Sequence, residues 1–148
     1  MRDPGLIRAV VLAGVLLAAT VVGVWYRRRT GQIRAVSSAP GAGPSAALAG
    51  LGVVVGAPTL VQFSSAVCAP CRATRRVLDR VAATVDGVRL VEVDAEQHLD
   101  AARELGIWST PTVLLVDADG RVARRVSGVP DAAALTTEVR GLPAGVTR

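Results

Sequence analysis

The two cysteines of this chain form the pattern that is best suited to chemistry. Cys68 and Cys71 enclose Ala69 and Pro70, and no other cysteine occurs in the 148 residues. Two intervening residues at the first turn of a helix bring the sulfur atoms close enough to form a readily reversed disulfide. One sulfur can attack a disulfide and the other can resolve the mixed disulfide, so the pair indicates thiol–disulfide exchange.

A helical pattern over residues 69–85 follows the first cysteine. Cys68 would stand just before this helix, where free backbone N–H groups and the positive end of the helix dipole favour a thiolate. Cys71 would lie one turn inside, shielded by the helix, and Pro70 fits a first turn where a missing N–H costs nothing. We therefore expect Cys68 to be the nucleophile and Cys71 the resolving thiol.

Other roles of a cysteine pair fit the sequence less well. A zinc site needs two more ligands, and the chain offers a single histidine, His98, which lies in a polar segment and is interpreted as a solvated surface residue. A metal carrier, such as a copper carrier, would need a nearby Met or a pair of His. A structural disulfide across so short a loop would stabilise little. We predict no metal site.

The charge distribution argues against nucleic-acid binding. The net charge is +5, but residues 1–44 hold six Arg against one Asp, and the rest of the chain holds 11 Arg and 11 acidic residues. Aromatic residues make up only 3% of the chain, so there is no platform on which bases could stack. The excess of positive charge therefore belongs to the amino-terminal part.

An uncharged apolar run over residues 9–26 predicts a membrane anchor. As a helix, its 18 residues would span roughly 27 Å, close to the hydrocarbon thickness of a bilayer. Trp25 and Tyr26 end the run at the place of interfacial aromatics, and arginines 27–29 follow. A cleaved signal peptide is the alternative, although the three arginines stand where small residues would be expected. Residues 1–29 are interpreted as a single-pass anchor with a basic flank.

The side of the membrane is not decided by the sequence. More arginines follow the apolar run than precede it, so the positive-inside rule slightly favours a cytoplasmic domain. Redox domains on amino-terminal anchors are also displayed outside the membrane, and a single cysteine pair is compatible with either compartment. Residues 30–47, rich in Pro, Gly, Ala and Ser, predict a flexible linker to a domain over residues 48–148.

The pattern of the domain predicts strands and helices in alternation. Apolar runs cover residues 51–55 and 59–63, a helix 69–85, a strand 88–93, a short helix 99–105, a hairpin 112–116 with 121–126, and a last helix 130–142. Alternation of strands and helices implies parallel pairing, and the hairpin adds antiparallel strands. The expected fold class is α/β, with a central mixed sheet flanked by helices.

Residues 50–142 resemble the thioredoxin family. The resemblance rests on Cys-Ala-Pro-Cys-Arg at 68–72 after a strand, on Val-Glu-Val-Asp at 91–94, on Leu-Gly-Ile at 105–107, and on Thr-Pro-Thr at 110–112 before an apolar strand. With its anchor, the chain is similar to membrane-tethered bacterial thioredoxin-like proteins. The resemblance implies a thioredoxin-like fold and a protein-disulfide oxidoreductase without cofactor, whose electron donor is a thioredoxin reductase or a membrane thiol relay.

The resemblance also implies a substrate-binding surface. The Thr110–Pro111 bond is expected to be cis and to face the Cys68 sulfur, with the backbone of Thr110 pairing an extended substrate segment. Ala69 and Pro70 complete the expected surface for protein disulfides and dithiols. Pro70 between the cysteines resembles the reducing members, which favours reduction over oxidation.

Two positions depart from the family pattern. Thioredoxins place Trp before the first cysteine and a buried Asp in the preceding strand, where this chain has Val67 and Gln62. A neutral amide cannot relay the proton of the resolving thiol, so we expect slower release of the mixed disulfide, with water or another carboxylate taking the proton. These departures keep open an alternative, a non-catalytic thioredoxin-like module that binds or chaperones a partner at the membrane.

Other residues near the motif have two interpretations each. Trp108 either lines the peptide groove or caps the core. Arg72, Arg75 and Arg76 have spacings that share a helix face. They are interpreted as a solvated face, although they could also lower the pKa of Cys68 or steer acidic partners.

Overall fold

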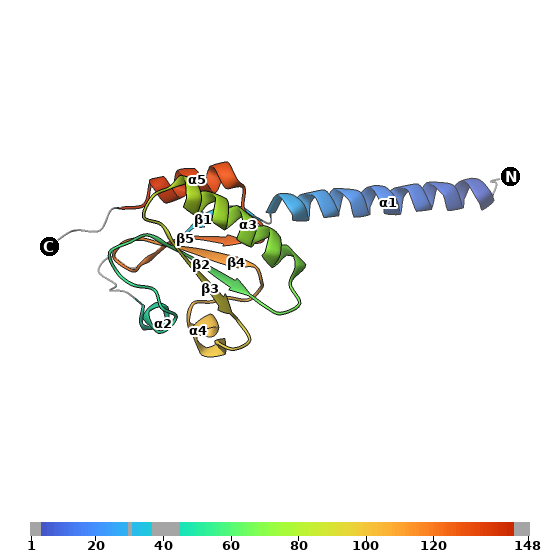
Figure 1. Cartoon of the computed structure of the whole chain (residues 1–148). Coiled ribbons are helices and arrows are strands. Elements are labelled where there is room, and N and C mark those ends of the chain that lie inside the picture. Colours follow the sequence, from blue (N-terminus) through green and yellow to red (C-terminus); the bar gives the residue numbers. More distant parts are fainter. Residues whose placement is uncertain (1–3, 30, 37–44, 144–148) are drawn as a thin grey trace. The chain divides into compact units, whose positions relative to one another are not determined.

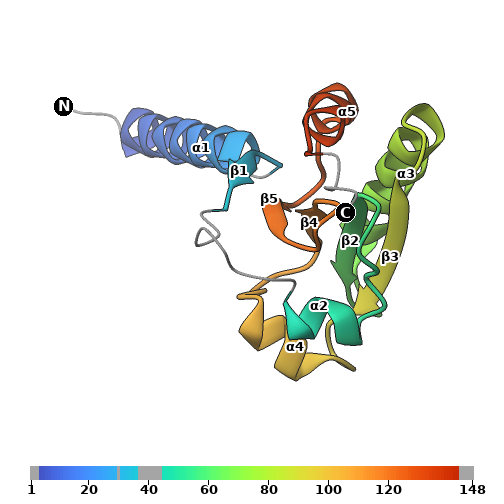
Figure 2. The same cartoon turned by 90° about the vertical axis from the view of Figure 1, so that its left-hand side faces the viewer.

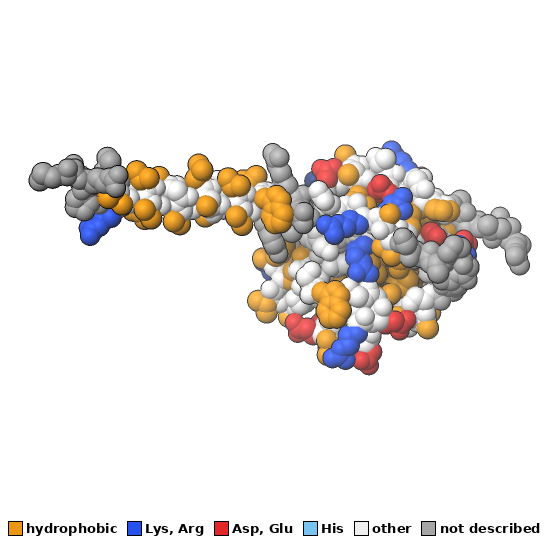
Figure 3. Space-filling model, turned by 180° about the vertical axis from the view of Figure 1, so that it is seen from behind, with side chains coloured by type: hydrophobic (Ala, Val, Ile, Leu, Met, Phe, Trp, Pro, Cys, Tyr) orange, Lys and Arg blue, Asp and Glu red, His pale blue; other side chains and the backbone are white. Residues whose placement is uncertain are grey.

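The computed structural model describes residues 4–29, 31–36 and 45–143 and divides into two compact units, residues 1–30 and residues 31–148. The first unit contains α1 (Pro4–Arg29). Its segment Ile7–Trp25 has a mean hydropathy of 2.3 and none of it is buried, so the helix is long and apolar enough to cross a membrane. Figure 3 shows apolar side chains exposed along this helix. A signal sequence would have the same properties.

The second unit is built on a five-stranded mixed sheet with the order β1-β5-β4-β2-β3. The central strand β2 (Thr59–Ser64) pairs in parallel with β3 (Arg89–Asp94) and antiparallel with β4 (Thr112–Val116). β5 (Val122–Ser127) continues from β4 as a hairpin, and β1 (Ile33–Ala35) pairs antiparallel with β5. The predicted mixed sheet and hairpin are therefore confirmed.

Helices cover both faces of this sheet (Figures 1 and 2). α3 (Ala69–Thr84) and α5 (Ala132–Arg140) lie on one face, and α2 (Ala46–Gly50) and α4 (Leu99–Glu104) lie on the other. Alternate residues of β2 supply the two cores, because successive side chains of a strand point to opposite faces. Leu60 packs with the α3 and α5 side, whereas Val61 and Phe63 pack with the α2 and α4 side.

The structure differs from expectation at three places. The apolar run over residues 51–55 forms no strand, although Val53 is buried in the core. Residues 30–47 do not form a linker throughout: Ile33–Ala35 is the edge strand β1, and α2 begins at Ala46. Sequence patterning missed β1 because Ile-Arg-Ala is shorter than the run of about four to eight residues over which alternation indicates a strand. The backbone groups of β1 are paired by β5. Residues 37–44 of the expected linker lie outside the described residues.

Candidate functional site

The two cysteines lie at the amino-terminal end of α3, directly after the loop that follows the central strand. Cys68 is the N-cap of the helix, and Cys71 lies in its first turn. Their sulfur atoms form a disulfide, with an S–S distance of 1.98 Å and Cα atoms 5.2 Å apart. Cys68 is partly exposed, whereas Cys71 is only 4% exposed. A disulfide partner that approaches from solvent therefore meets Cys68 first.

The helix terminus is arranged to stabilise negative charge on Cys68. The backbone N–H of Cys71 donates a hydrogen bond to Cys68 Sγ at 3.2 Å and another to the Cys68 carbonyl oxygen at 3.1 Å. Pro70 lies in the first turn, where its missing N–H leaves no helical hydrogen bond unmade. A donor aimed at the sulfur, together with the helix dipole, favours the thiolate once the pair is reduced.

The second loop of the expected site contains the Thr110–Pro111 bond, which is cis as the family resemblance implies. The hydroxyl groups of Ser65 and Thr110 are 3.2 Å apart, and this contact joins the loop that precedes Cys68 to the loop that contains Pro111. Pro111 is buried, and Thr110 is partly exposed. Ala69 and Pro70 are exposed beside Cys68. The binding of a substrate by these four residues stays a prediction.

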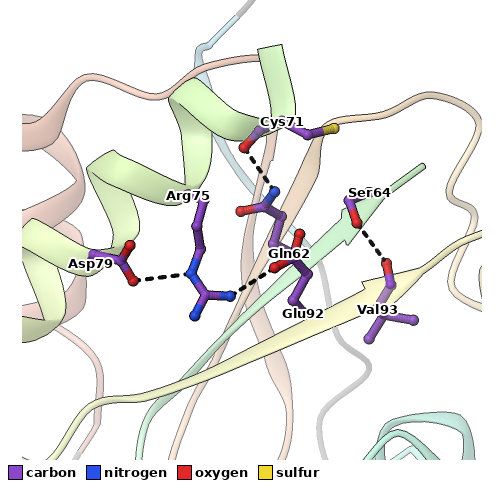
Figure 4. A network of polar contacts seen from close by, with 7 residues as sticks. All are labelled: Gln62, Ser64, Cys71, Arg75, Asp79, Glu92 and Val93. Atoms are coloured by element: carbon purple, nitrogen blue, oxygen red, sulfur yellow. Dashed lines mark hydrogen bonds and ion pairs between the residues drawn. The ribbon is translucent and has the colours of Figure 1, made fainter. Parts of the chain in front are cut away.

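Gln62 lies at the centre of the sheet, beneath α3, which carries both cysteines and is called the redox helix below (Figure 4). The side chain is 1% exposed, and its Nε2 donates a hydrogen bond to the Cys71 carbonyl oxygen at 3.1 Å. Its Oε1 has no hydrogen-bond partner among the described residues. The position from which the family resemblance expects proton relay is therefore occupied by a buried amide that contacts the redox helix.

The three arginines nearest the start of α3 lie in different surroundings. Arg75 donates to Asp79 Oδ1 at 3.0 Å and to Glu92 Oε2 at 2.8 Å, so its charge is neutralised from two sides (Figure 4). Arg72 is exposed and lines a pocket with both cysteines. Arg76 is exposed and lines a different hollow, beside Val129.

Sequence reasoning did not single out Glu92. It is a charged residue inside the otherwise apolar segment Val-Glu-Val of β3, and its position opposite Gln62 in the sheet brings it to the redox helix. A charged residue between two valines in the middle of a strand is the signal that could find it.

Exposed apolar side chains accompany the site. Val67, directly before the first cysteine, is 97% exposed. Trp108 is 87% exposed and therefore does not cap the core, which leaves the groove interpretation of this residue. His98 is exposed and is the N-cap residue of α4 without a side-chain hydrogen bond there. Within residues 4–29, 31–36 and 45–143, no three His, Cys, Asp or Glu side chains gather as metal ligands would.

Comparisons with known proteins agree with this geometry. The thioredoxin family model matches residues 53–141. Thioredoxin 1 from Synechococcus elongatus is 35% identical over 74 residues, which are 49% of this chain and 69% of the relative. Thioredoxin 1 from Nostoc sp. is 32% identical over the same shares. The X-ray structure of Fasciola hepatica thioredoxin superposes with a TM-score of 0.53 and 25% identity, covering 60% of this chain and 84% of that one.

Proposed function

The chain belongs to the thioredoxin family and is a protein-disulfide oxidoreductase, and we propose that it reduces protein disulfides from a membrane anchor. The observation that carries the proposal is the Cys68–Cys71 disulfide at the amino-terminal end of α3, with the Cys71 N–H donating to Cys68 Sγ. Cys68 is the partly exposed sulfur, so it is assigned as the nucleophile, and the shielded Cys71 is assigned as the resolving thiol.

The reaction begins with the reduced pair. The Cys68 thiolate attacks one sulfur of the substrate disulfide, a Cys68–substrate S–S bond forms, and the other substrate sulfur leaves as a thiolate. Cys71 then loses its proton and attacks Cys68 Sγ. The Cys68–Cys71 bond forms, the second substrate thiolate leaves, and two electrons have passed from the cysteine pair to the substrate. An external dithiol, a reductase-type partner, returns the pair to its reduced state.

The substrates are proposed to be protein disulfides bound in an extended form. The Ser65–Thr110 contact fixes the Pro111 loop to the loop before Cys68, so both can contact one substrate segment. The exposed side chains of Val67 and Trp108 offer apolar contacts at the same end of the domain as this loop pair. Pro70 between the cysteines supports the reducing direction.

The test of activity is the reduction of insulin by the full chain in detergent, with dithiothreitol as the electron source. The wild type should accelerate the reduction well above the rate with dithiothreitol alone, whereas Cys68→Ser should give no acceleration. Cys71→Ser should accumulate a mixed disulfide with insulin, since the resolving thiol is missing. A wild type that binds insulin without accelerating its reduction would contradict the proposal and support the non-catalytic binding module.

The anchor is proposed to be α1. Its segment Ile7–Trp25 is uncharged except for Arg8, which lies near one end, where a long side chain can reach the headgroups. Extraction of membranes at alkaline pH should leave the full-length chain in the membrane fraction. A shorter chain in the soluble fraction would instead show that the segment is a cleaved signal sequence.

The side of the membrane on which the domain lies can be determined by thiol labelling of intact cells. A membrane-impermeant maleimide applied to intact cells reaches the cysteines only if the domain lies outside. Labelling without a reductant would indicate an outward domain that is kept reduced, and labelling only after reduction would indicate an outward oxidant. Labelling that requires lysis would place the domain in the cytoplasm, where thiol maintenance fits the proposed direction.

A further inference from the structure

A pocket of about 260 Å³ opens beside the disulfide on the side of the sheet covered by α3. The residues that line it come from the end of β2, the following loop, the start of α3 and β3: Ser64, Ser65, Ala66, Cys68, Cys71, Arg72, Arg75 and Glu92. Both sulfur-bearing residues and one carboxylate, that of Glu92, therefore border a single polar space. A polar pocket of this size has room for several water molecules.

Glu92 reaches the pocket because of the register of the central strands. β2 and β3 are parallel, and Gln62 and Glu92 are direct neighbours across them. Both side chains contact α3, Gln62 through the Cys71 carbonyl and Glu92 through Arg75 (Figure 4). The carboxylate thus lies next to the buried amide, toward solvent, with a side chain that is 42% exposed.

Arg75 fixes where the carboxylate lies. It donates to Glu92 Oε2 at 2.8 Å from one side and to Asp79 Oδ1 at 3.0 Å from the other. Arg72, on the next turn of α3 toward the cysteines, is the other charged residue that lines the pocket. Glu92 Oε2 is thereby occupied by Arg75, and no hydrogen bond from another described residue is made to Oε1. Arg75 is a positioning residue in this arrangement.

The resolving step needs an acceptor for one proton, because the Cys71 thiol must become a thiolate before it attacks. Gln62 is the polar side chain in direct hydrogen-bond contact with the Cys71 backbone, but a neutral amide does not take up a proton at neutral pH. A carboxylate can do so. Among the residues that line the pocket, Glu92 is the one with a carboxylate.

We propose that Glu92 accepts the proton of the Cys71 thiol, through water in this pocket, when Cys71 resolves the mixed disulfide. The inference rests on the proposed function, since it concerns the second step of that reaction. The proton leaves Cys71 Sγ for Glu92, Cys71 Sγ bonds to Cys68 Sγ, and the Cys68–substrate bond breaks. The departing thiolate takes a proton from solvent, and Glu92 returns its proton to solvent through the open side of the pocket.

The two steps can be separated with the aromatic disulfide dithionitrobenzoate as the probe. The reduced full chain in detergent should release one thionitrobenzoate when Cys68 attacks, and a second when Cys71 resolves the adduct. The first phase depends on the concentrations of both reactants, whereas the second is intramolecular and does not. Cys71→Ser should keep the first phase and lose the second. A wild type without the second phase would contradict the proposed function itself, independently of Glu92.

Glu92→Gln should leave the first phase within about twofold and slow the second by tenfold or more, a threshold set below the roughly hundredfold effect at the lower end for a general base. Its second phase should also rise about tenfold per pH unit between pH 6 and 8, because the proton must then leave to hydroxide. Asp79→Asn is the matched control: Asp79 also pairs with Arg75 but does not line the pocket, so both phases should stay within about twofold.

A second variant tests the proton transfer against a structural effect. In the Gln62→Asp background, a carboxylate stands next to the Cys71 backbone, so the further change Glu92→Gln should cost less than about threefold in the second phase. The proposal is overturned if Glu92→Gln leaves the second phase unchanged, or if it slows both phases by the same factor. It is also overturned if the loss is the same with and without the Gln62→Asp substitution.

Discussion

The side-chain amide of Gln62 donates a hydrogen bond to the carbonyl oxygen of Cys71 at 3.1 Å, so a neutral buried group joins the central strand to the redox helix. The amide nitrogen, Nε2, thus has a hydrogen-bond partner, whereas the amide oxygen, Oε1, has none among the described residues. The side chain beneath the resolving cysteine therefore holds the helix through a hydrogen bond but carries no charge.

Gln62→Asp should make stability depend on pH. Burial raises the pKa of a carboxyl group, here above the value of about 3.9 in the unfolded chain. The folded variant then binds a proton more tightly than the unfolded one, so the added cost is small below pH 4 and grows as pH rises toward the folded pKa. We expect the free energy of unfolding, measured in urea, to fall by roughly 3 kcal/mol more at pH 7 than at pH 4.

The control for this prediction is Gln62→Asn, which shortens the side chain without adding a titrating group. Its loss of stability should be the same at the two pH values. Equal losses for Gln62→Asp at pH 4 and pH 7 would show that position 62 is open to solvent in the folded protein, contrary to its 1% exposure.

Thr74→Val should stabilise the domain. Thr74 lies in α3 with no exposed surface, and its hydroxyl has no hydrogen-bond partner among the described residues. Replacing a buried unpaired hydroxyl by a methyl group of the same shape removes a desolvation cost, so we expect a gain of about 1 kcal/mol in urea unfolding. Thr84→Val is the control, because Thr84 is exposed and its hydroxyl donates to the Arg80 carbonyl. If Thr74→Val instead lowered the free energy of unfolding, as the loss of a buried hydrogen bond would, the prediction would be wrong.

Gly31→Ala should release the edge strand β1 from β5. Gly31 has a φ of 87°, its N–H donates to the Ser127 carbonyl, and an added Cβ would lie 2.5 Å from the Val129 carbonyl oxygen. Hydrogen exchange of the Ile33–Ala35 amides should therefore become faster. Gly52 also has a positive φ, 84°, but a Cβ added there has no atom within 4 Å. Gly52→Ala is therefore the control for backbone strain alone. Equal protection of β1 in the two variants would show that the contact with Val129 is unimportant.

Reduced Cys68 should be alkylated at a pH where an ordinary cysteine is still protonated. The Cys71 N–H at 3.2 Å from Cys68 Sγ and the helix dipole both favour the thiolate. In the Cys71→Ser variant, the rate with iodoacetamide should reach its midpoint below the value of about 8.5 usual for a free cysteine. Denatured protein provides the reference. If the folded and denatured proteins had the same pH midpoint of alkylation, the helix terminus would not be the cause of the reactivity of Cys68.

Much of this site was predictable because its signals are local. The cysteine spacing, the apolar segment before it and the helical pattern after it predicted the redox pair at the start of α3, and β4 begins and ends where the pattern placed it. The cis bond at Thr110–Pro111 came from the family resemblance, since an X-Pro pair alone predicts a trans bond. Such features follow from a few consecutive residues or from one motif.

Tertiary structure decided which side chains meet at the cysteines. Arg75 and Glu92 are 17 residues apart, and only the parallel register of β2 and β3 brings the carboxylate of β3 to α3. The same holds for β1, whose three residues are too few for their alternation to indicate a strand; they form one because β5 offers unpaired backbone groups. Local propensity describes how a segment prefers to fold, whereas the partner of an ion pair or an edge strand depends on where the rest of the chain has already packed.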